Sequence, residues 1–101
     1  MFGKLGDMMS RIGEMKQKAE EVKQALEHNR IHAEGAGGDV KVEMNGNRKL
    51  ISLDIAPALQ HGDAEALRKH LMLTFNKAVA EADKVFEEEM KKAASGILPG
   101  L

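Results

Sequence analysis

The stretch "VKVEMNGNRKLISLDI", from Val40 to Ile55, alternates apolar and polar side chains on both sides of an Asn45-Gly46 pair. This pattern predicts a β-hairpin, because Asn-Gly suits a two-residue type I′ turn. Such a turn places Val40 opposite Ile51 and gathers the apolar side chains on one face. Two strands are not stable alone in water, so this face requires a cover from elsewhere. The predicted apolar face consists of Val40, Val42, Met44, Ile51, Leu53 and Ile55.

Two helical segments flank the hairpin and are available as that cover. In the first, apolar residues recur in alternating steps of three and four from Leu5 to Leu26, which predicts a helix from near Leu5 to near Asn29. In the second, Asp63 is a suitable N-cap, and an apolar stripe predicts a helix that ends near Ala94. The first half of this second helix is the natural cover for the sheet, and its last turns extend beyond it.

A short strand from Ile31 to Glu34 completes the predicted sheet. The "GAGG" that follows lacks the spacing of a phosphate-binding loop and predicts a flexible or bulged connection. The chain of 101 residues is therefore predicted to be one α+β domain with element order α-β-β-β-α, a small antiparallel sheet and two long helices. Its expected parts are an N-terminal helix (1–30), a three-stranded sheet (31–57), a C-terminal helix (63–94) and a flexible tail (95–101).

The composition argues against several classes of function. The chain has no Cys, which excludes disulfides, thiolate nucleophiles and Cys-based zinc sites and is compatible with a cytoplasmic location. No apolar run is long enough to cross a bilayer. His28 and His32 are four residues apart but straddle the predicted helix end, with no further ligand nearby. We therefore expect no enzyme activity, cofactor, metal site, small-molecule substrate or membrane partner.

The charges on the first helix are segregated around its apolar seam. With Leu5 at heptad position a, every basic residue from Lys4 to Arg30 falls at e or g, next to the seam, and the acids fall at b and c. The net charge of −1 gives no overall preference for a polyanion, so the local arrangement decides. Two interpretations stay open. The basic rows pair with acids on the second helix, such as Glu81 and Glu88, or they contact phosphates.

Several strings, in their order and spacing, resemble the YbaB/EbfC family of small bacterial nucleoid-associated DNA-binding proteins. They are "MFGKLGDMM", "GAGGDVKVEMNG", "LISLDIAPAL", "LTFNKAVAEA" and "LPGL", and together they cover nearly the whole chain. Ala56 departs from the Asp that many relatives have before the proline. The resemblance implies a homodimer with projecting helical arms that binds duplex DNA at the nucleoid in the cytoplasm, with possible effects on gene expression. It also implies that the partner of the hairpin is largely a second copy of the chain.

The family has no short motif for DNA contact, so we predict the contact residues from the charge geometry. The candidates for DNA binding are Lys4, Arg11, Lys16, Lys18, Lys23, Arg30, Lys84, Lys91 and Lys92. The candidates for the dimer interface are the apolar residues Val40, Val42, Ile51, Leu53, Leu67, Leu71 and Phe75. The alternative function is a non-enzymatic dimeric adaptor, in which the helical seams bind other proteins and the basic rows pair with acids.

Overall fold

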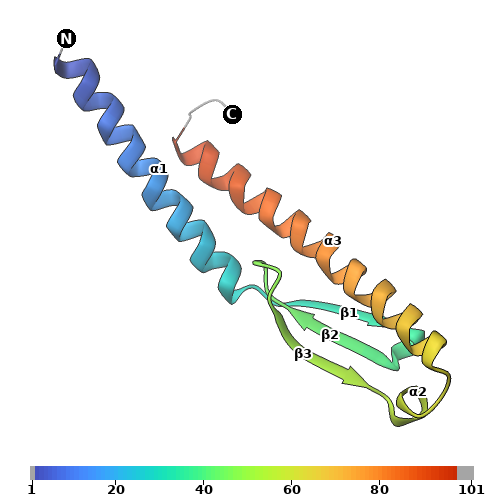
Figure 1. Cartoon of the computed structure of the whole chain (residues 1–101). Coiled ribbons are helices and arrows are strands. Elements are labelled where there is room, and N and C mark those ends of the chain that lie inside the picture. Colours follow the sequence, from blue (N-terminus) through green and yellow to red (C-terminus); the bar gives the residue numbers. More distant parts are fainter. Residues whose placement is uncertain (1, 98–101) are drawn as a thin grey trace.

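The computed structural model describes residues 2–97 of the chain, with side chains for residues 3–95. The elements in chain order are α1 (Phe2–His28), β1 (Ile31–Gly35), a 3₁₀ turn η1 (Ala36–Gly38), β2 (Val40–Met44), β3 (Leu50–Ile55), α2 (Pro57–Gln60) and α3 (Ala64–Ile97). The molecule is elongated, with extents of 70 × 21 × 19 Å. Figure 1 shows the small sheet at one end and the two long helices running side by side away from it. This confirms the predicted α+β class and order of helix, strands and helix.

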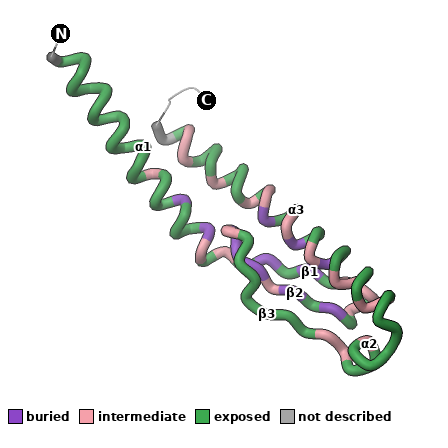
Figure 2. Tube along the Cα trace, in the orientation of Figure 1, coloured by how far each residue is buried: buried purple, intermediate pink, exposed green. Residues whose placement is uncertain are grey.

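The three strands form one antiparallel sheet in the order β1-β2-β3. Helix α3 crosses the inner face of β1 and β2, where its small residues Ala78 and Ala82 are fully buried against the strands. Because alanine side chains are short, the helix approaches the sheet closely. Figure 2 shows the buried residues along these two strands and the facing turns of α3, whereas β3 is almost entirely exposed. The core cluster consists of Ile31, Ala33, Val40, Val42, Met44, Ala78 and Ala82.

The predicted hairpin register is wrong by four residues. Val40 pairs with Ile55 rather than Ile51. The β2–β3 loop has five residues, Asn45 to Lys49, instead of two, which accounts for three positions, and a register irregularity between Glu43 and Met44, opposite Ile51, adds the fourth. The Asn45 side chain explains the longer loop: its Oδ1 accepts hydrogen bonds from the backbone N–H of Asn47 at 2.9 Å and of Lys49 at 3.0 Å. For Leu53 and Ile55 the shift of four is even, so their predicted facing survives.

The segment between β3 and α3 contains a helical turn that the sequence analysis missed. Pro57 ends the strand as expected, but it also occupies the first turn of α2, where its fixed φ and missing N–H are favourable. Asp63 then caps α3 as predicted, accepting hydrogen bonds from the backbone N–H of Glu65 and Ala66 at 3.3 Å each. Helix α3 continues to Ile97, three residues into the segment expected to be a flexible tail. The rest of that segment, 98–101, lies outside the described residues.

Helices α1 and α3 run antiparallel and differ in how far they are covered. The seam of α1 is buried only near the sheet, at Val22 and Leu26, which are 7% and 1% exposed. Its first half extends past the end of α3 in Figure 1 and is exposed throughout in Figure 2. The seam residues left uncovered there are Leu5, Met8, Ile12 and Met15, each at least 50% exposed.

Candidate functional site

The basic side chains of α1 lie mostly free on the surface. Lys4, Arg11, Lys16 and Lys23 are exposed, and none of them forms an ion pair with any described residue. Their ammonium and guanidinium groups are hydrated and accessible, as a phosphate contact requires.

Four of the other five candidate cations form polar contacts within their own part of the chain. Lys18 pairs with Glu21 at 3.3 Å within α1, and Nη1 of Arg30 donates to the backbone carbonyls of Glu27 and Asn29. On α3, Lys91 is exposed without an ion pair to a described residue. Pairs between exposed residues within one helix contribute about 0.3–0.5 kcal/mol, so a phosphate can displace them. The remaining two pairs of this kind are Lys84–Glu81 at 3.3 Å and Lys92–Glu89 at 3.4 Å.

Within the described residues, no ion pair joins α1 to α3. Glu81, which the sequence offered as a partner for the basic rows, pairs with Lys84 of its own helix instead. The interpretation in which the second helix neutralises the rows of the first is therefore not realised inside this chain.

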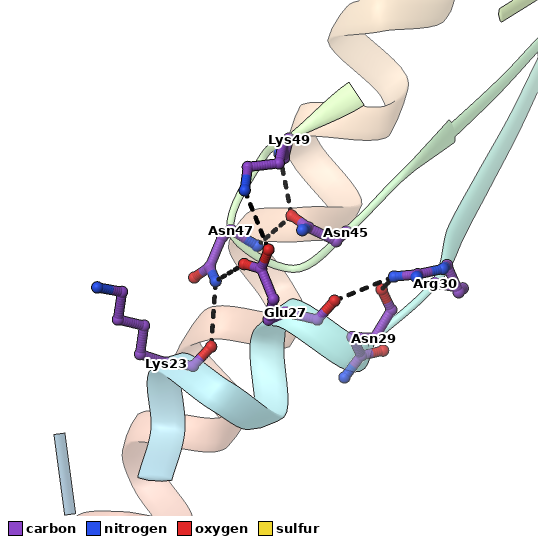
Figure 3. Close-up of polar contacts among 7 residues, drawn as sticks. All are labelled: Lys23, Glu27, Asn29, Arg30, Asn45, Asn47 and Lys49. Atoms are coloured by element: carbon purple, nitrogen blue, oxygen red, sulfur yellow. Dashed lines mark hydrogen bonds and ion pairs between the residues drawn. The ribbon is translucent and has the colours of Figure 1, made fainter. Parts of the chain in front are cut away.

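A polar cluster joins the β2–β3 loop to the end of α1, as Figure 3 shows. Nδ2 of Asn47 donates to the Lys23 carbonyl at 3.1 Å and to Oε2 of Glu27 at 2.8 Å, and Nζ of Lys49 contacts Oε1 of Glu27 at 3.0 Å. The hydrogen bonds from Asn47 and Lys49 lower the pKa of Glu27 below its ordinary value of 4.5. The sequence did not predict this cluster. Its only signal was the polar string after Asn45, interpreted as a plain two-residue turn.

The same loop contacts α3 through Arg48, a residue with a positive φ of 65°. Its Nε donates to Oδ1 of Asp83 at 2.9 Å, its Nη2 donates to the same oxygen, and the guanidinium lies 5.7 Å from the centre of the Phe86 ring. The β2–β3 loop therefore touches both long helices.

The candidates for a dimer interface divide into two groups. Val40 and Val42 are 0% and 2% exposed, because α3 of the same chain covers them, so they present no surface to a second copy. Ile51 and Leu53 are 42% and 39% exposed on β3, which α3 does not cover. The α3 candidates Leu67, Leu71 and Phe75 are half-buried, the last two lining an open groove of about 380 Å³. Met72 also lines it and, like Leu73, is an exposed apolar residue that the prediction omitted.

No group of three or more potential metal-ligating side chains occurs among the described residues. His32 contacts Glu43 across the outer face of the sheet at 3.7 Å, a pair rather than a ligand set. Within residues 2–97, no helix has the length and apolar content that crossing a bilayer requires.

Comparison with known proteins gives consistent matches over nearly the full length. The model of the YbaB/EbfC DNA-binding family matches residues 1–97. A nucleoid-associated protein of Chlorobium phaeovibrioides is 37% identical over 94 residues, covering 93% of this chain and 85% of that protein. Another from Alkaliphilus metalliredigens is 30% identical over 99 residues, covering 96% and 87%. The crystal structure of the uncharacterised protein HP0035 from Helicobacter pylori superposes with a TM-score of 0.69 at 28% identity, covering 97% of each chain.

Proposed function

The chain belongs to the YbaB/EbfC DNA-binding family, and from this premise we propose that it is a nucleoid-associated protein that binds duplex DNA as a homodimer. Its contacts are mainly to phosphates, from basic side chains of α1 and α3. We place it at the nucleoid in the cytoplasm, where binding can affect gene expression. The proposal is for a binding protein and not for an enzyme.

The observation that carries the proposal is the set of unpaired cations on α1. Lys4, Arg11, Lys16 and Lys23 border one seam and point to solvent, and no carboxylate of α3 pairs with them in the described structure. Phosphate contacts of this kind are largely independent of base sequence and release counterions, so affinity falls as salt rises. A homodimer presents each contact twice, which compensates for a chain whose net charge is only −1.

The support for a homodimer is the uncovered apolar surface on the inner face of the sheet. Leu53 pairs with the buried Val42, so it faces the side that α3 covers elsewhere, yet it remains exposed. Ile51 on β3 is exposed as well, and Leu71 and Phe75 line an open groove on α3. Exposed apolar surface on a small domain with a modest core is typical of a subunit interface.

Binding to a duplex of random sequence, followed by fluorescence anisotropy over a series of salt concentrations, tests the function. We expect a steep decline of affinity with salt and a shallower slope for the Lys16→Glu, Lys23→Glu variant. The matched control is Lys41→Glu, Lys69→Glu, which changes the net charge equally at exposed residues away from α1. Absence of binding at low salt, or the same loss in both variants, would contradict the proposal.

One observation favours the adaptor function as a second candidate. The seam residues Leu5, Met8, Ile12 and Met15 are exposed, and an uncovered apolar strip on a helix is typical of a surface for another protein. Substituting Met8 and Ile12 with Gln separates the two functions. Phosphate binding survives this change because every cation remains, whereas an adaptor loses its contact surface.

A further inference from the structure

We propose that the β2–β3 loop (residues 45–49) fixes the direction of α1 relative to α3 and thereby positions the basic side chains of α1 on DNA. Glu27, Asn47 and Arg48 are then positioning residues, which act on binding without contacting phosphate themselves. This inference rests on the proposed function and assigns a role to a cluster that the phosphate contacts leave unexplained.

The contacts with α1 lie at the last turns of the helix. Beyond the bonds to the Lys23 carbonyl and the Glu27 carboxylate, the backbone N–H of Gly46 donates to the Leu26 carbonyl at 2.8 Å. The Leu26 carbonyl, one of the last four of α1, also accepts from the backbone N–H of Asn29 at 3.2 Å, so the loop contributes part of the C-terminal cap from a distant part of the chain. Leu26 is 1% exposed, which shows that this end of α1 is firmly packed.

The contacts with α3 lie on the other side of the same loop. The two bonds from Arg48 to Asp83 and the position of its guanidinium over Phe86 bind the loop to the middle of α3. A five-residue segment therefore connects the two helices, and only Asn29 and Arg30 separate α1 from the sheet in sequence.

The length of α1 makes its direction important. Lys4 lies 19 residues before Lys23, which is about 28 Å along a helix. A rotation of about 10° at the loop moves Lys4 by about 5 Å, more than the axial spacing of about 3.4 Å between successive phosphates on one strand. A loosened attachment therefore prevents simultaneous contacts at the two ends of α1.

The first test compares Glu27→Ala with Glu20→Ala. Both variants remove one negative charge from an exposed or half-exposed position on α1, and Glu20 forms no ion pair with a described residue. Electrostatics alone predicts slightly tighter DNA binding for both. If α1 of the Glu27→Ala variant adopts the binding direction only about a tenth to a fifth of the time, the apparent Kd of this variant for DNA rises about five- to tenfold. Equal or tighter binding by both variants would overturn the inference.

The second test keeps the charge constant. Asn47→Ala removes the two bonds to α1, and Asn29→Ala is its control, because the Asn29 side chain forms no hydrogen bond with described residues. We expect weaker DNA binding for Asn47→Ala with an unchanged salt slope, since every phosphate contact remains available. A reduced slope would identify a lost phosphate contact instead and would overturn the inference.

A distance measurement separates positioning from a general loss of stability. The chain has no Cys, so spin labels at Ser10→Cys on α1 and Ser52→Cys on β3 are unique. With labelled protein diluted into unlabelled protein, only the distance within one chain is observed. The distribution broadens in Asn47→Ala and stays narrow in Asn29→Ala, at a temperature at which circular dichroism shows both to be folded. A narrow distribution in both overturns the inference. Failure of the unsubstituted protein to bind DNA overturns the proposed function instead.

Discussion

At the residue scale, Gly46 is where the β2–β3 loop comes closest to α1. A Cβ at this position lies 2.7 Å from Cδ2 and 3.0 Å from the carbonyl oxygen of the buried Leu26. We predict that Gly46→Ala lowers the free energy of unfolding by about 1–3 kcal/mol, because the packed helix end has no room to move. Urea denaturation measures this. The control, Gly13→Ala, has no atom within 4 Å of the new Cβ and should not destabilise the protein.

The second prediction at this scale concerns the pKa of Glu27. Because the Asn47 amide and Lys49 lower this pKa in the folded chain, the unfolded chain binds the proton more tightly. The contribution of Glu27 to stability is therefore fully present above about pH 4.5 and is lost as the pH falls through the lowered pKa. Melting temperatures at several pH values test this against Glu27→Ala. The difference between the two proteins should narrow toward pH 3, and parallel curves would contradict the prediction.

At the scale of elements, the sequence predicted patterns well and connections poorly. The long helices and the facing of Val42 and Leu53 follow from periodicities of 3.6 and 2, which local side chains determine. The hairpin register depended on the Asn45 side chain, which accepts from the backbone two and four residues later, and on an irregularity in the ladder opposite Ile51; the Asn-Gly pair reveals neither. The short helix α2 was missed because Pro57 both ends a strand and begins a helix.

The first half of α1 is the element with the least support. It carries Gly3, Gly6 and Gly13, none of which is required by a close neighbour, and its seam is exposed. Each glycine costs a helix about 1 kcal/mol relative to alanine, and an uncovered segment of this length is marginal in water. We predict that amides of residues 5–14 exchange with deuterium faster than those of residues 22–28. The double variant Gly6→Ala, Gly13→Ala should slow the exchange of residues 5–14. Equal protection of residues 5–14 and 22–28 in the unsubstituted protein would contradict the prediction.

At the scale of the whole molecule, the proposed homodimer interface includes the uncovered inner face of β3. Leu53 is 39% exposed in the single chain. We predict that Leu53→Glu leaves the chain folded but separates the dimer. An unpaired carboxylate buried in the interface costs about 3 kcal/mol or more, equivalent to a rise in the dimer Kd of at least about a hundredfold. Sedimentation equilibrium measures this dimer Kd. Ser52→Glu, on the opposite face of the same strand, should remain dimeric.

The candidate site was predictable from the sequence only in part, for a reason of scale. The heptad positions identified the accessible cations of α1, because helical periodicity places them beside the seam without further information. The cluster of Glu27, Asn47 and Lys49 was not predictable, since Glu27 lies about 20 residues from the other two and meets them only through the fold. For the same reason, the sequence could not show whether Val40 and Val42 are buried by α3 of the same chain or by a second copy. In the structure, α3 covers them.

The exposed first half of α1 lies outside the buried core that the sheet and α3 form. We therefore expect substitutions among residues 3–14 to change the exposed surface of α1 while the sheet and the part of α3 that covers it stay folded.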